Sequence, residues 1–203
     1  MPYNKVIFVD GDGTCRSAMI RIIMKSKFLL HPIEIESRGM VVLFPEPLDA
    51  KAHAVLDAYG YAVDDIPARQ LVQEDIRDDV LILTMEDRQK LKIWEEFENA
   101  RHVYTLSEFI HYSGDILPLY GEPVESYEEW IVRMDKLLDE LVICLNERSI
   151  RDSAAAERES QMAQDRPETE NTGTGSFGED ENSTVHKEEK ADVGETDGLS
   201  DLG

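Results

Sequence analysis

The stretch KVIFVDGDGTCRSAMI, residues 5–20, decides the fold and contains the candidate site. Residues 5–9 form an apolar run typical of a strand buried on both faces. From residue 17 the apolar residues recur at helical spacing, which predicts a helix to about residue 27. The loop between them, 10–16, therefore leads from a strand into a helix N-terminus, where free N–H groups attract anions. The loop is predicted to bind an anion, and a plain glycine turn without a ligand is the alternative.

Strands and helices alternate along the first 150 residues. Further strands are predicted at 33–37, 79–84 and 102–106, and further helices at 49–59, at 86–97, in a short turn capped by Ser107, and at 126–147. This alternation favours a parallel sheet covered by helices. We therefore predict an α/β fold, a three-layer sandwich with a central four-stranded parallel sheet. Ligands of such sheets bind beyond the C-terminal ends of the strands, which again selects the loop 10–16.

The charge of the chain excludes some classes of partner. The 203 residues include 43 acidic and 21 basic side chains, a formal net charge of −22, so a basic face for nucleic acid is not expected. The two cysteines lie far apart in sequence, which argues against a disulfide framework and favours a reducing compartment. No apolar run approaches the roughly 20 residues that span a bilayer. We expect a cytoplasmic protein without a membrane partner and make no prediction about its oligomeric state.

The composition changes near residue 150. Residues 151–203 carry 15 acidic and 5 basic side chains and a single aromatic residue, Phe177. Such a segment cannot bury enough apolar surface to offset the entropy of ordering its backbone. The sequence predicts a folded domain over 1–150 and a disordered acidic C-terminal tail over 151–203, which acts either as a solubilising tail or as an acidic interaction segment.

Two phosphatase patterns overlap in the loop. Residues 10–14, Asp-Gly-Asp-Gly-Thr, resemble the opening motif of haloacid-dehalogenase-type phosphatases, but the lysine and acidic pair of that family do not follow Thr84 in the required order. Cys15 and Arg21 satisfy the C-x5-R spacing of cysteine phosphatases, yet the residues between them contain no glycine and have a helical pattern. Because a helix cannot wrap its N–H groups around a phosphate, the cysteine pattern is disfavoured, and the dehalogenase pattern is disfavoured because its lysine and acidic pair are not found in order.

A third resemblance covers the chain to about residue 148. The segments TCRSAM (14–19), IESRGM (35–40), GYAVDDIPARQL (60–71), DDVLILTM (78–85), VYTLSEF (103–109) and GDILPLYGEPVESYEEW (114–130) are similar, in order, to motifs of the low-molecular-weight protein tyrosine phosphatase family. The resemblance implies the predicted fold, a cysteine-phosphatase loop without a cofactor, and a phosphorylated protein or small oxyanion as the partner.

The departures from the family pattern lie at the positions that carry its chemistry. The resemblance implies that Asp10 occupies the position of the nucleophilic cysteine and that Cys15 matches the second, non-nucleophilic cysteine. It places Pro118 where the family has its general acid. Arg16, which would bind the phosphoryl oxygens, and Ser17, which would stabilise the nucleophile, are retained.

Three functions stay open. The first is a catalytically impaired phosphatase that acts as a binding or regulatory module with a residual phosphate loop, in which Asp10 or Asp12 itself fills the anion site or caps the helix. The second is an active phosphomonoesterase with Asp10 as nucleophile, Mg²⁺ on Asp10 and Asp12, and Asp115 as a displaced acid. The third is another ligand or partner function on the same fold. The predicted phosphate loop comprises Gly11, Asp12, Gly13, Thr14, Cys15 and Arg16, with Tyr120 at its rim and no metal outside the second hypothesis.

Overall fold

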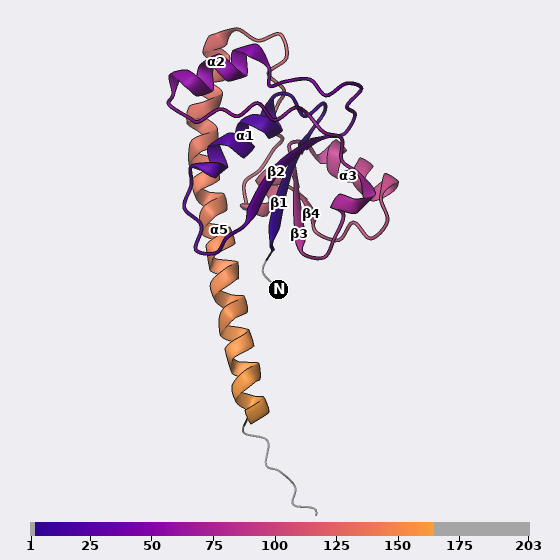
Figure 1. Cartoon of the computed structure of the whole chain (residues 1–203), viewed down its shortest axis with the longest axis vertical. Coiled ribbons are helices and arrows are strands. Elements are labelled where there is room, and N and C mark those ends of the chain that lie inside the picture. The colour runs from indigo at the N-terminus through magenta and orange to yellow at the C-terminus, as the bar shows by residue number, and fades with distance from the viewer. Residues whose placement is uncertain (1–2, 165–203) are drawn as a thin grey trace, which may run out of the picture. The chain divides into compact units, whose positions relative to one another are not determined.

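The computed structural model describes residues 3–164, which belong to one compact unit, and contains the predicted parallel sheet (Figure 1). The strands are β1 (Lys5–Asp10), β2 (Glu34–Gly39), β3 (Val80–Thr84) and β4 (Val103–Thr105). Their order in the sheet is β2-β1-β3-β4, and every neighbouring pair is parallel. The prediction of a central four-stranded parallel sheet is confirmed.

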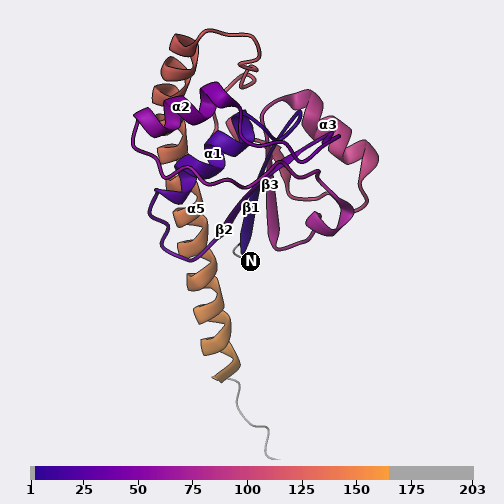
Figure 2. The same cartoon turned by 45° about the horizontal axis from the view of Figure 1, so that its top comes forward.

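Helices form the two outer layers. They are α1 (Arg16–Lys25), α2 (Ala50–Ala58), α3 (Asp87–Glu96), α4 (Leu106–Phe109) and α5 (Val124–Gln164), with a short 3-10 helix, η1 (Gln73–Asp75). Figures 1 and 2 show α1, α2 and α5 on one side of the sheet and α3 on the other. The three-layer arrangement is therefore also confirmed.

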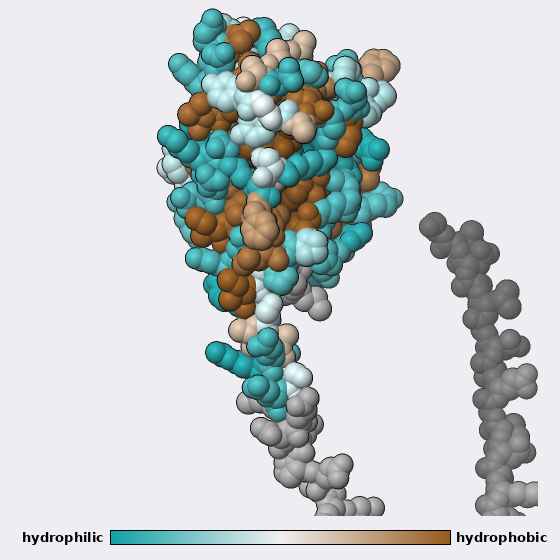
Figure 3. Space-filling model, turned by 60° about the vertical axis from the view of Figure 1, so that its left-hand side comes forward, coloured by the Kyte–Doolittle hydropathy of each residue, from teal (hydrophilic) through white to brown (hydrophobic). Residues whose placement is uncertain are grey.

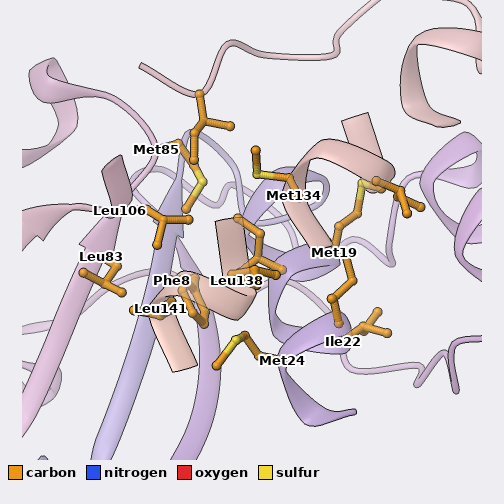
Figure 4. Close-up of a cluster of buried hydrophobic side chains, with 14 of the residues drawn as sticks. Phe8, Met19, Ile22, Met24, Leu83, Met85, Leu106, Met134, Leu138 and Leu141 are labelled. Atoms are coloured by element: carbon orange, nitrogen blue, oxygen red, sulfur yellow. The ribbon is translucent and has the colours of Figure 1, made fainter. Parts of the chain in front are cut away.

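Alternate side chains of the strands supply two cores. Phe8 and Leu83 point toward α1 and α5, where they join Met19, Met134 and Leu138 in the larger cluster (Figure 4). The intervening residues of the same strands pack toward α3 in the smaller cluster, with Ile7, Val9, Ile82 and Ile93 fully or almost fully buried. Because the central strands β1 and β3 are buried on both faces, each reads as a continuous apolar run rather than as an alternating one.

The last helix is longer than the sequence predicted. The prediction ended this helix at Glu147, whereas α5 continues to Gln164. The physical reason is the composition of 148–164, which is rich in alanine and charged helix formers and contains neither glycine nor proline before Pro167. The segment predicted as a tail, 151–203, thus begins with helix, and residues 165–203 lie outside the described part of the chain.

A second correction concerns the cap of α4. The sequence predicted Ser107 as the capping residue, but Ser107 lies inside the helix and Thr105 caps it by accepting the N–H of Glu108. At α2 the predicted start and stop are both observed. Asp49 accepts the N–H groups of the first turn, and Gly60, with φ of +80°, follows the last turn.

The surface agrees with the acidic, charged composition. Figure 3 shows a face on which hydrophilic residues surround patches of apolar ones. Among the described residues, no helix is both long and apolar enough to cross a membrane.

Candidate functional site

The loop 11–15 lies at the C-terminal ends of β1 and β2. Its backbone is held by three hydrogen bonds, from Met40 N–H to Asp10 C=O, from Val41 N–H to Gly11 C=O, and from Asp49 N–H to Thr14 C=O, with N···O distances of 2.8–3.0 Å. The loop also approaches β2 closely. A Cβ atom on Gly39 would lie 2.4 Å from the carbonyl carbon of Asp12, so this contact requires glycine.

Asp10 ends β1 and turns its carboxylate back into the loop. Oδ1 accepts the N–H of Gly13 at 2.8 Å and the hydroxyl of Ser17 at 2.9 Å, and Oδ2 accepts the N–H of Ser17 at 3.1 Å. The residue is 2% exposed. Because Ser17 lies in the first turn of α1, Asp10 caps this helix from seven residues upstream, while the Cys15 side chain makes no capping bond.

Asp12 uses further donors of the same loop. One of its oxygens, Oδ1, accepts both the N–H of Thr14 at 2.9 Å and the Thr14 hydroxyl at 2.8 Å. Unlike Asp10, Asp12 is exposed. Three of the N–H groups that could converge on a bound anion, those of Gly13, Thr14 and Ser17, are thus hydrogen-bonded to the two aspartates of the loop itself.

Arg16 is buried and held by groups outside the loop. Its Nη1 donates to Glu86 Oε1 at 2.7 Å and to the Ile116 carbonyl at 2.6 Å. Its Nε lies 4.0 Å from Asp10 Oδ2. Glu86 is itself 6% exposed, and its second oxygen lies 2.7 Å from Arg88 Nε. The guanidinium therefore faces two carboxylates, Asp10 and Glu86.

The protonation of these groups follows from their surroundings. Burial raises the pKa of Asp10, against the opposing effects of Arg16 and of the hydrogen bonds from Ser17. Burial also disfavours ionised Glu86, but hydrogen bonds from Arg16 and Arg88 outweigh it and lower the pKa of that carboxyl. For Cys15, burial and the nearby Asp10 raise the pKa of the thiol to about 12. At neutral pH Cys15 is therefore a thiol and not a nucleophilic thiolate.

The other predicted site residues lie apart from this network. The carboxylate of Asp115 accepts the N–H of Asp87 at 3.0 Å, so it is a hydrogen-bond acceptor at the start of α3. Tyr120 is 96% exposed. Pro118 lies in the loop before α5 and lines a surface cavity with Leu119 and Trp130. Five surface cavities in the described part of the chain, including the one at Pro118, are lined by residues outside 10–16.

Arg21 does not take part in a phosphate loop. Its guanidinium donates to both carboxylate oxygens of Asp64 at 2.6 Å and to the Ser37 hydroxyl at 3.2 Å. The C-x5-R spacing from Cys15 is therefore coincidental. Thr84, the residue that the dehalogenase pattern would use, is fully buried and donates its hydroxyl to the Glu86 carbonyl at 3.1 Å.

Among the residues that the structure describes, no group of three or more His, Cys, Asp or Glu side chains is arranged to hold a metal ion. The pair Asp10 and Asp12 directs its carboxylates to donors of the loop. Mg²⁺ at this pair stays a prediction of the second hypothesis.

Sequence reasoning missed Glu86 as a site residue. The sequence predicts Glu86 at the start of a helix and, with Asp87, as an acidic pair of the disfavoured dehalogenase pattern, yet Glu86 binds Arg16 from 70 positions away in the sequence. A signal was available, because Glu86 follows the buried strand β3 and β3 pairs directly with β1. Residues that follow neighbouring parallel strands lie at the same edge of the sheet. The Ile116 carbonyl, a backbone group in an irregular loop, gave no such signal.

The similarity of this chain to known proteins covers most of its length and is not confined to the loop. The model of the family described as low molecular weight phosphotyrosine protein phosphatase matches residues 5–156. A curated relative, the low molecular weight protein-tyrosine-phosphatase PtpB of Staphylococcus aureus, is 29% identical over 144 residues, which cover 69% of this chain and 99% of the relative.

Solved structures give the same result. The low molecular weight protein tyrosine phosphatase from T. tengcongensis is 32% identical, with a TM-score of 0.63 over 68% of this chain and 97% of the other. The YwlE arginine phosphatase from Geobacillus stearothermophilus is 28% identical, with a TM-score of 0.68 over 74% of this chain and 97% of the other. Together with the family match, these likenesses show that the chain belongs to the low molecular weight phosphotyrosine protein phosphatase family.

Proposed function

We propose that this protein is a catalytically impaired phosphatase that acts as a binding or regulatory module of its family. The observation that carries the proposal is the position of the Asp10 carboxylate. It is buried, and it accepts hydrogen bonds from Gly13 and from both the backbone and the side chain of Ser17. A substrate phosphate would have to compete for these donors with a carboxylate that is covalently part of the loop.

Electrostatics add to this competition. A phosphate entering the loop would meet Asp10, Asp12 and Glu86, and the guanidinium of Arg16 already faces two of these carboxylates. One unit charge at about 4 Å repels another by roughly 4 kcal/mol at an effective dielectric near 20. Arg16, Ser17 and the glycine backbone leave a residual phosphate loop with weakened affinity.

Besides the nucleophilic cysteine, the chain lacks the general acid of its family. Protonation of the leaving oxygen typically contributes about 10²–10⁴-fold to the rate. The resemblance to the family puts Pro118, which cannot donate a proton, at the position of that acid. Asp115, three residues earlier, is hydrogen-bonded to Asp87 at the start of α3. We propose that neither residue protonates a leaving group.

The partner that this function requires is a phosphorylated protein or a small oxyanion. We also propose that the protein is cytoplasmic. The relatives are described as tyrosine phosphatases and, in one case, as an arginine phosphatase. Peptides that carry phosphotyrosine or phosphoarginine are therefore the ligands to test first.

One observation favours an active enzyme as the second candidate. The Ser17 hydroxyl donates to Asp10 Oδ1, as a hydroxyl would donate to an anionic nucleophile. In this alternative the Asp10 carboxylate would attack phosphorus and break its bond to the leaving oxygen, which would take a proton from Asp115. Water would then hydrolyse the aspartyl phosphate and release inorganic phosphate. Asp10 and Asp12 would be the residues that hold a Mg²⁺ ion, which would balance the charge.

A gain-of-function series tests the proposal. Asp10→Cys should restore a nucleophile, and Asp10→Cys with Pro118→Asp should hydrolyse an aryl phosphate at least about tenfold faster than Asp10→Cys alone, because it regains the acid. Asp10→Ser with Pro118→Asp is the matched control and should stay inactive. If wild type already hydrolyses the substrate as fast as the double variant, the chain is not impaired and the proposal fails.

A further inference from the structure

One of the surface cavities lies at the end of the sheet opposite the loop 10–16. Its volume is about 520 Å³, within the range of pockets that hold small organic ligands. Tyr3, just before β1, and His102, just before β4, line it. Since Asp10 ends β1 and a strand rises about 3.3 Å per residue, the loop and this cavity are roughly 20 Å apart.

Cationic and hydrogen-donating side chains converge on this cavity. Arg148 and Arg151 of α5 line it together with His31 and His102. Arg151 Nε makes a 3.4 Å hydrogen bond to the Glu147 carbonyl. The guanidinium of Arg148 lies over the Phe109 ring, 4.5 Å from its centroid, which holds it in place.

Two hydroxyl groups complete the donor set. Ser149 is 6% exposed and lines the cavity, where its hydroxyl can donate a hydrogen bond to a ligand. The Tyr3 hydroxyl lies 3.4 Å from His102 Nδ1, and burial raises the pKa of Tyr3, so this hydroxyl keeps its proton at neutral pH.

Two carboxylates, Asp78 and Asp152, also line the cavity. An inorganic anion alone would fill only part of the volume and would leave the Asp78 carboxylate facing it. A ligand with hydroxyl or amino groups beside its anionic group matches both kinds of side chain.

We propose that this cavity binds a small organic anion, with a phosphate or carboxylate on Arg148 and Arg151 and with hydroxyl or amino groups toward Asp78. Arginine is suited to such oxyanions because its planar donors match two oxygens at once. The site is separate from the phosphate loop and does not depend on whether that loop is active. A ligand here would join α5 to the residues that precede β1 and β4.

Inorganic phosphate is the simplest probe. Phosphate is titrated into the full chain at an ionic strength that is kept constant with chloride. The protein carries no N-terminal tag, because Tyr3 lines the cavity. ¹⁵N–¹H spectra show which residues the phosphate contacts. Saturable shifts are expected at Tyr3, His102 and 148–152. No saturation up to about 20 mM phosphate, or shifts confined to Gly11 and Gly13, would overturn the proposal.

Three variants test the assignment by affinity. Arg151→Ala, Arg148→Met and Ser149→Ala should each weaken phosphate binding, the arginine variants by about tenfold, since a hydrogen bond to a charged group is worth about 1.5–3 kcal/mol. Arg148→Met keeps an apolar chain over Phe109 and so protects the fold. Arg158→Ala, at an exposed position about two helical turns beyond Arg151 on α5, is the matched control and should bind as wild type does. Equal binding by Arg151→Ala and Arg158→Ala would refute the site.

Discussion

Single side chains determine how this loop differs from a working phosphate site. Asp10 and Asp12 accept the hydrogen bonds that an anion would need, and Glu86 holds the one arginine of the loop. A carboxylate is not excluded as a nucleophile by its charge alone, since a thiolate is also an anion. What distinguishes Asp10 is that its oxygens are already hydrogen-bonded and buried, so it stabilises the start of α1.

Glu86 is predicted to contribute to stability through Arg16. Glu86→Gln removes the charge that faces the buried guanidinium, so the free energy of unfolding at pH 7 should fall by about 2 kcal/mol. Urea denaturation measures the change. Asp87→Asn is the matched control, because its carboxylate is 58% exposed and pairs with Lys90, and it should change stability by less than about 0.5 kcal/mol. Similar losses in the two variants would contradict a structural role for Glu86.

Among the elements, the contact between the loop and β2 is the tightest. A methyl group on Gly39 would lie 2.6 Å from the Asp12 carbonyl oxygen and 2.7 Å from Val42 Cγ2, so Gly39→Ala should destabilise the fold by about 1–3 kcal/mol. Gly11→Ala, which meets no atom within 4 Å, is the control and should cost less than about 1 kcal/mol. Thermal unfolding of both variants tests this, and a Gly39→Ala protein as stable as Gly11→Ala would show that the loop is not tightly held.

The Asp64 carboxylate joins α1 to the segment after α2. Hydrogen bonds from Arg21, and then from Lys25, hold the pKa of this carboxyl well below its usual range. A lowered folded pKa means that the stabilisation is present above the unfolded value, about 3.9, and is lost as the pH falls below it. Asp64→Asn should therefore lower the free energy of unfolding by about 2 kcal/mol at pH 7, and its difference from wild type should shrink below about pH 4.

The control for this pH dependence is Asp57→Asn, an exposed position on α2. It should match wild type at each pH to within about 0.5 kcal/mol. A difference between Asp64→Asn and wild type that stays constant from pH 7 to below pH 3 would mean that the stabilisation is not electrostatic.

The elements also show how far the sequence alone could lead. The parallel sheet follows from four short strand-like segments, two of them continuous apolar runs, separated by helical patterns, and the Thr-Cys-Arg-Ser segment points to the family. The sequence also suggested that an aspartate of the loop would fill the anion site. The position of Glu86 directly after β3 is a signal for the carboxylate partner of Arg16, whereas nothing in the sequence points to the Ile116 carbonyl, which lies 100 residues from Arg16. The charge pattern changes near residue 150, but the helix propensity of 148–164 continues, so α5 ends at Gln164 and not at the predicted Glu147.

For the whole molecule, stability is predicted to reside in residues 1–165. The larger core cluster is built from the sheet, α1, α2 and the first half of α5. Removal of 166–203 takes away 11 acidic and 3 basic residues but only one aromatic, so the melting temperature should change by less than about 3 °C. Calorimetry of the truncated and full chains compares them directly. A loss of about 8 °C or more would show that the acidic segment is part of the folded domain.

The most direct test of the central claim is the turnover of wild-type protein on phosphotyrosine and phosphoarginine peptides, with and without Mg²⁺ or Mn²⁺. Asp10→Asn serves as the matched variant, because it keeps the shape of the side chain and removes its charge. The account predicts no turnover above background for either protein under any of these conditions. Turnover by wild type that Asp10→Asn abolishes would contradict it and would make Asp10 a nucleophile.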